Sequence, residues 1–115
     1  MYKDLKVYQR SYKLAISLYK FAITMPKDER YGLTSQIKRA ATSIPLNIAE
    51  GYGKHDTKPE IKRFLKMAKG SCNELEILMD MCKDLDFMNE EVHRRYVDEI
   101  HEIGAMLYGL LKSLN

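Results

Sequence analysis

The chain has 115 residues, of which 45% are hydrophobic and 30% are charged. This length fits one domain with one core, and this composition excludes a disordered tail. With 19 basic and 16 acidic residues, the chain is only mildly basic. The charged N-terminal segment and the lack of an apolar run near the roughly 20 residues of a membrane span predict a cytoplasmic protein without a membrane segment.

The first predicted helix covers residues 4–25, where apolar residues recur at steps of three and four. One apolar stripe consists of Leu5, Tyr8, Tyr12, Ala15, Tyr19 and Ala22. A second stripe beside it consists of Val7, Leu14, Leu18, Phe21 and Met25. Pro26 ends the helix because proline disfavours the helical conformation in the residue before it.

The second predicted helix covers residues 31–51 and carries one apolar stripe, Leu33, Ile37, Ala40, Ile44 and Ile48. Pro45 lies inside it and removes one backbone hydrogen bond, so we expect a kinked helix and not two separate ones. Gly51 and Gly53 are expected to stop the helix, since glycine accepts the left-handed conformation of a C-terminal cap.

The third and fourth predicted helices cover residues 58–85 and 90–113. Thr57 and Glu60 have the spacing of a capping box, and Asn89 has the position of an N-cap. Because short connections place neighbouring helices antiparallel, these elements predict an all-α, up-down-up-down four-helix bundle of one domain.

The two cysteines, Cys72 and Cys82, lie ten positions apart in the third predicted helix. At about 1.5 Å per residue they are roughly 15 Å apart, too far for a disulfide. We expect them to be reduced, small apolar residues without a zinc ion.

The two stripes of the first helix suggest self-association. Together they occupy roughly 220° of the helix, against a usual core-facing arc of about 100°. We expect the second stripe, with Val7, Leu14, Leu18 and Phe21, to be buried against another subunit. The alternative is a wide core that covers both stripes within one chain.

A polar strip runs along the second helix within an arc of roughly 80°. Its members are Gln36, Arg39, Ser43, Asn47 and Glu50. Amide and hydroxyl groups in such a row can form a hydrogen-bonded network with a neighbouring helix or subunit. The alternative is a strip that faces solvent.

The predicted topology collects basic residues at one end of the bundle. Residues 1–13, 50–70 and 105–115 contain eleven Lys and Arg against four Asp and Glu, a net charge of +7, and the remainder has eight against twelve, −4. Such a patch can bind RNA or DNA by releasing counterions, without reading sequence; the alternative is a solubilising surface. The candidate nucleic-acid ligands are Lys3, Lys6, Arg10, Lys13, Lys54, Lys58, Lys62, Arg63, Lys66 and Lys69.

No arrangement of residues predicts an enzyme, a metal site or a cofactor. Glu90 and His93 have the spacing of a dimetal motif, and Asp98 and His101 resemble it, but both pairs lie on the fourth helix. No nucleophile motif or glycine-rich phosphate loop is present.

The sequence resembles one known family. Its main signature matches residues 31–51, YGLTSQIKRAATSIPLNIAEG. Further matches are Phe64-Leu65, Ala68, Gly70-Ser71, Glu74-Leu75 and the segment Leu5-Lys6-Val7-Tyr8-Gln9. These residues resemble the 23S rRNA-intervening-sequence proteins, although Tyr8 stands where tryptophan is usual and Lys54 where arginine is common.

The resemblance implies a bacterial four-helix bundle that forms a ring-like homopentamer. The family's own function is poorly defined. It is similar to the accessory variability determinant of diversity-generating retroelements, a basic pentamer that works with a reverse transcriptase and nucleic acid. The sequence therefore predicts a non-enzymatic homo-oligomer that binds nucleic acid as an accessory factor. The alternative is an oligomeric protein-interaction scaffold that binds no nucleic acid.

Overall fold

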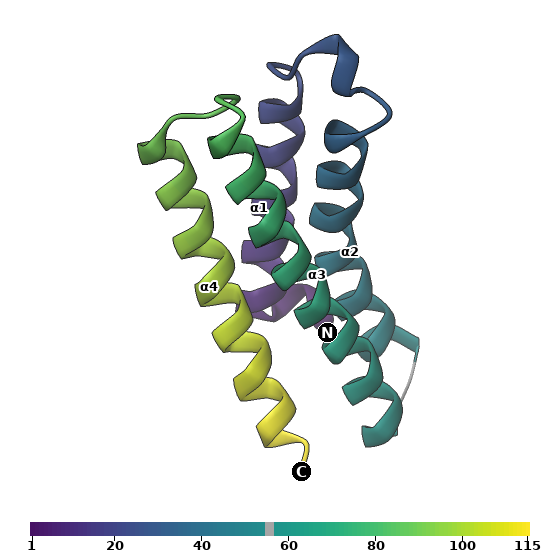
Figure 1. Cartoon of the computed structure of the whole chain (residues 1–115). Coiled ribbons are helices and arrows are strands. Elements are labelled where there is room, and N and C mark those ends of the chain that lie inside the picture. Colours follow the sequence, from purple (N-terminus) through teal and green to yellow (C-terminus); the bar gives the residue numbers. More distant parts are fainter. Residues whose placement is uncertain (55–56) are drawn as a thin grey trace.

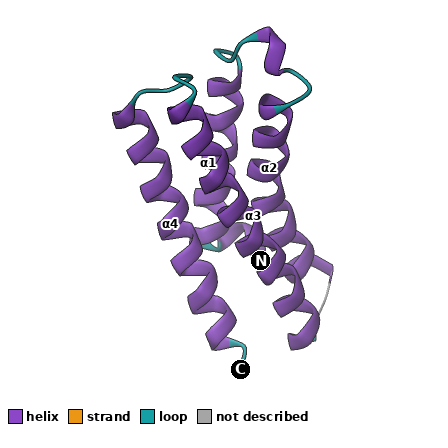
Figure 2. Cartoon of the chain, in the orientation of Figure 1, coloured by secondary structure: helices purple, strands orange, loops and turns teal. Residues whose placement is uncertain are grey.

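The computed structural model describes residues 1–54 and 57–115, and within them all regular structure is helical (Figure 2). The elements in this part are η1 (Tyr2–Asp4), α1 (Lys6–Ala22), η2 (Lys27–Glu29), α2 (Leu33–Lys54), α3 (Lys58–Asp84) and α4 (Glu90–Ser113). The predicted all-α class with four long helices is confirmed. None of the helices described is both long and apolar enough to cross a bilayer.

The four α-helices lie side by side along the length of the molecule (Figure 1). The longest dimension is 43 Å, and the 27 residues of α3 span about 40 Å of it at 1.5 Å per residue. In Figure 1 the α1–α2 and α3–α4 connections lie at one end, and the C-terminus lies at the other. Each helix packs against the next and α1 also packs against α4, whereas the backbones of α1 and α3 stay apart in the described residues. α1 and α3 are therefore diagonal partners.

The boundaries of α3 and α4 agree with the sequence to within a residue. The Oδ1 atom of Asn89 accepts a hydrogen bond from the backbone N–H of Val92 at 2.8 Å, and α4 begins directly after it. Thr57 stands at the N-cap position of α3, but its side chain makes no cap hydrogen bond. α1 is shorter at both ends than predicted.

The prediction that Gly51 and Gly53 stop the second helix is wrong, because α2 continues to Lys54. Gly51 is buried against α3: a Cβ atom there would lie 3.1 Å from the Cβ of Phe64. Gly51 thus allows α2 and α3 to pack closely, and its own backbone has no positive φ. The helix also continues through Pro45, as predicted for one helix and not two.

The second stripe of α1 faces the core of its own chain. Val7, Leu14 and Leu18 are 5% exposed or less, and Phe21 packs against the same cluster. The prediction that Val7, Leu14 and Leu18 lie at a subunit interface is therefore wrong, whereas half-buried Phe21 leaves it untested for that residue. The physical reason is that α2 and α4 flank α1 on two sides, so the bundle covers a wide arc of this helix.

Candidate nucleic-acid interface

Arg10 connects α1 to α4 through two carboxylates. Its Nε donates to Glu99 Oε2 at 3.0 Å, and its guanidinium also bonds Glu99 Oε1 and lies 3.1 Å from Glu102 Oε2. Hydrogen bonds to Glu99 and then Glu102 raise the pKa of Arg10. Because two acidic groups already surround this cation, the prediction that Arg10 binds nucleic acid is not supported by its surroundings.

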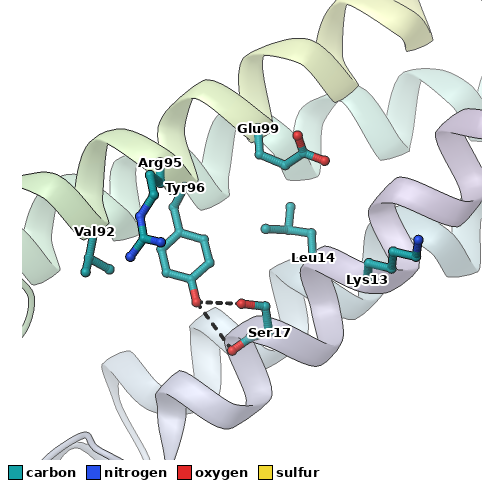
Figure 3. Close-up of a pocket in the computed structure, with 7 residues that line it drawn as sticks. All are labelled: Lys13, Leu14, Ser17, Val92, Arg95, Tyr96 and Glu99. Carbon is teal, nitrogen blue, oxygen red and sulfur yellow. Dashed lines mark hydrogen bonds between the residues drawn. The ribbon is translucent and has the colours of Figure 1, made fainter.

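A shallow pocket of about 320 Å³ lies beside this ion pair, between α1 and α4 (Figure 3). Leu14 and Val92 supply apolar surface, and the Tyr96 hydroxyl lies 2.8 Å from Ser17 Oγ. Lys13 and Arg95 also line it (Figure 3). The hydroxyl groups of Tyr96 and Ser17 bond to each other, so this hydrogen bond connects α4 to α1.

The strongest basic feature is a row of lysines on the first half of α3, which we name the lysine stripe. It consists of Lys58, Lys62, Lys66 and Lys69. On a helix these positions fall within about 80° and span about 16 Å along the axis. The acid of this segment, Glu60, lies 3.3 Å from Arg63. The stripe therefore presents four positive charges in a row along one side of α3.

The lysine stripe faces the α4 side of the molecule. Lys62 Nζ donates to the side-chain Oδ1 of Asn115, beyond the end of α4. Lys69 lines a groove of about 300 Å³ with residues of α4 that include Tyr108. Lys112 of α4 lies 5.6 Å from the Tyr108 ring centroid and adds a fifth cation near this end. Lys58, Lys66 and Lys69 have no ion-pair partner among the residues described.

The other candidate cations are dispersed. Lys3, Lys6 and Lys13 belong to the α1 side, and among the described residues the backbone of α1 stays apart from that of α3. Lys54 lies 3.5 Å from Glu50, and Arg63 packs 4.4 Å from the Phe64 ring centroid on the α2 side of α3. The structure thus separates the ten predicted nucleic-acid ligands into an α1 group and the α3 lysine stripe, with Lys54 and Arg63 paired locally.

The polar strip of α2 forms part of the predicted hydrogen-bonded network, and its partner is α3. Ser43 Oγ lies 2.7 Å from Ser71 Oγ, and Asn47 Nδ2 donates to Ser43 O at 2.8 Å and Ser43 Oγ at 2.9 Å. Arg39 lies 3.9 Å from Glu74 across the same helix pair. Gln36 is exposed, and Glu50 pairs with a lysine of its own helix. Ser43 and Asn47 therefore specify how α2 packs on α3.

The two histidines of α4 connect it to α3. His93 Nε2 lies 2.7 Å from Asp80 Oδ1, and His101 Nε2 lies 2.8 Å from Glu76 Oε1. In residues 1–54 and 57–115, no three His, Cys, Asp or Glu side chains gather closely enough to hold a metal ion. Within the same residues, both cysteines are free and buried. Burial raises the pKa of each thiol from 9.0 to about 11, which keeps it protonated and unreactive.

The model of the 23S rRNA-intervening sequence protein family matches residues 3–109. The chain belongs to this family. A solved structure of a protein of unknown function from the S23 ribosomal protein family of Bacteroides thetaiotaomicron superposes with a TM-score of 0.82. It is 23% identical in sequence, and the match covers 92% of this chain and 98% of that one, so the likeness extends to the fold. A comparison with curated proteins finds no match.

Two exposed apolar surfaces were not predicted from the sequence. One includes Ile16 on α1 and Leu46 on α2, which are 44% and 66% exposed; the other includes Ile77 and Met81 on α3, which are 61% and 45% exposed. The sequence does contain one indication of these surfaces, because each of the four residues falls outside the apolar stripe of its own helix. Whether such a residue is exposed depends on where the neighbouring helices lie, and sequence periodicity does not give their positions.

Proposed function

We propose that this protein is a non-enzymatic, self-associating bundle that binds RNA or single-stranded DNA through the lysine stripe of α3, without sequence specificity. The supporting observation is the row of four lysines on one side of α3, three of them without an ion-pair partner in the part of the chain described. Cations in a row match the repeating charge of a phosphate backbone, and their binding releases condensed counterions. Lys112 extends the same surface onto α4.

The lysine stripe offers no chemistry for reading bases. Its side chains are cationic point charges, and Tyr108 is the aromatic residue close to it on α4. Specific readout needs several polar groups that face base edges or a platform of stacked rings. The expected ligand is therefore recognised by its charge, and the role is that of an accessory factor. Self-association would repeat the stripe in each subunit and increase the affinity.

The test is a filter-binding titration of a short RNA and a short single-stranded DNA at several salt concentrations. We compare the parent with the triple variant Lys62→Glu, Lys66→Glu and Lys69→Glu. The triple variant should lose at least about tenfold in affinity at low salt, and its slope in a log–log salt plot should fall by about 2, as expected from three lost phosphate contacts.

A matched control variant changes the same charge elsewhere, with Lys27→Glu, Arg30→Glu and Arg94→Glu, all exposed positions outside the stripe. It should keep most of the parent's affinity. If both triples lose affinity equally, the stripe has no special role. If the parent shows no salt-dependent binding, the protein is better described as a protein-interaction scaffold.

A further inference from the structure

The lysine stripe leads into a groove between α3 and α4, two helices that lie side by side (Figure 1). The groove has a volume of about 300 Å³, and we name it the α3–α4 groove. Lys69 and Asn73 line it from α3. On a helical projection these two residues fall within the same arc of about 60° as Lys62 and Lys66. A strand that is bound to the stripe therefore passes the entrance of the groove.

Two side-chain bridges between α3 and α4 lie on either side of this region. Lys62 Nζ donates to Asn115 Oδ1 beyond the end of α4, and His101 Nε2 lies 2.8 Å from Glu76 Oε1. Tyr108 lies between the two bridges and lines the groove from α4, seven residues and about 10 Å from His101 along the helix. The groove is therefore a short slot that the Glu76–His101 pair closes at one end.

The bottom of the groove contains a glycine that helix packing does not require. Gly104 is buried in the interior of α4, where glycine is less stable than alanine, yet a Cβ atom there would meet nothing within 4 Å. Gly70 and Gly109 also have free space, but both are exposed. Cys72 and Ile100 line the groove and are buried, so its bottom is apolar. The missing side chain of Gly104 leaves room for a flat ring.

The walls of the groove offer stacking and hydrogen bonding. Tyr108 is 55% exposed, and among the described residues its ring contacts only the cation of Lys112. A tyrosine ring can stack on any base, because every base has a π-face. Asn73 is exposed, and its side-chain amide makes no hydrogen bond in residues 1–54 and 57–115. An amide both donates and accepts, so it fits the edge of any base without selecting one.

The charge along α3 changes sign at the groove. The four lysines of the stripe come first, and Glu74, Glu76 and Asp80 follow them along the helix. A phosphate that entered the groove would meet the carboxylate of Glu76 at the closed end, whereas a base carries no charge. The backbone of a strand should therefore stay on the lysines while a base enters the groove.

We propose that the α3–α4 groove holds one unstacked base of a single strand that is bound to the lysine stripe. The ring of the base stacks on Tyr108 and covers Gly104. Lys66 and Lys69 hold the adjacent phosphates, and Asn73 bonds the edge of the base. The contact tolerates any sequence, but it requires a base without a pairing partner. This inference rests on the proposed function and adds a base contact to recognition by charge.

The test compares a short thymidine strand with a strand of the same length in which every sugar lacks its base, by fluorescence anisotropy at low salt. Both strands carry the same phosphates, so the lysine stripe alone would bind them equally. The parent should bind the base-bearing strand about tenfold more tightly, as expected for one stacked base. Tyr108→Ala and Gly104→Leu should each bring the two strands to equal affinity, whereas Tyr108→Phe, which keeps the ring, should preserve the difference.

Gly109→Leu is the matched control, because Gly109 lies on the same helix with the same free space but is exposed and does not line the groove. It should keep the tenfold preference, and urea unfolding checks that every variant is folded. Equal affinity of the parent for the two strands, with binding that depends on the stripe, would overturn this inference and leave the proposed function intact. So would a preference that survives Tyr108→Ala. Absence of binding to either strand would overturn both proposals.

A free mononucleotide has the same ring and phosphate as one nucleotide of the strand. Calorimetric titration with thymidine monophosphate to about 1 mM should show no binding, because one stacked ring and one phosphate fall short of millimolar affinity. Binding at this concentration that is lost in Tyr108→Ala would make the groove a site for a free nucleotide. That result would overturn its assignment to a strand.

Discussion

Replacement of Leu18 by alanine tests whether the second stripe of α1 belongs to the core of one chain. The Leu18 side chain is 0% exposed and lies in the central apolar cluster. Leu→Ala changes at such positions cost about 2.7 to 5 kcal/mol, from lost transfer free energy plus the cavity that remains. We expect about 3 kcal/mol, a large part of the ~5–15 kcal/mol that stabilises a domain. For a chain of this size that lowers Tm by about 12 °C.

The assay is urea unfolding followed by circular dichroism at two protein concentrations. Leu18→Met should cost less than about 1.5 kcal/mol, since it conserves volume. Tyr19→Ala, one position along, removes a side chain that is 44% exposed and should cost the single chain much less. A Leu18→Ala variant within about 0.5 kcal/mol of the parent, with the same dependence on urea, would refute the assignment of this stripe to the core.

Three further predictions concern caps, glycines and thiols. Asn89→Ala should destabilise the chain by about 1 kcal/mol in urea unfolding, whereas Asn89→Ser, which can still cap α4, should cost a few tenths. Gly109→Ala should stabilise by about 0.5–1 kcal/mol because a Cβ there meets nothing within 4 Å, whereas Gly51→Ala should destabilise because its Cβ would press on α3; equal effects would contradict the packing described. Cys72 and Cys82, each with a thiol pKa raised to about 11, should react with a disulfide reagent at pH 8 about 100-fold more slowly in the native chain than in urea. Rapid labelling of the native chain would contradict their burial. Because the pKa of each thiol is higher in the folded chain, their contribution to stability is lost as pH rises from 9 to 11.

Capping and periodicity were sufficient to locate most of the helices. Asn89 followed by acidic residues defines the start of α4, and apolar residues at steps of three and four define its core face. The glycines of α2 show where such local rules fail. Gly51 has the sequence signature of a helix stop, yet it serves as a contact point for α3, and only the position of α3 distinguishes these two uses.

The candidate site depended more strongly on packing between helices. The sequence located every basic residue, and a helical projection of residues 58–69 is enough to define the lysine stripe. It could not show that Arg10 is surrounded by Glu99 and Glu102, which are about ninety positions away in the chain. Nor could it show that α1 and α3 lie on a diagonal, which divides the basic residues into two groups.

The sequence by itself determined that this chain is helical and which family signature it carries. It also determined where two of the four helices, α3 and α4, begin and end to within a residue. Those properties depend on local backbone preferences and on the 3.6-residue period, which act over one or two turns. Only the tertiary structure decided that Leu18 is in the core while Ile16 and Ile77 face outward. Burial is set by which helices flank a given face, and that depends on contacts between residues far apart in the chain.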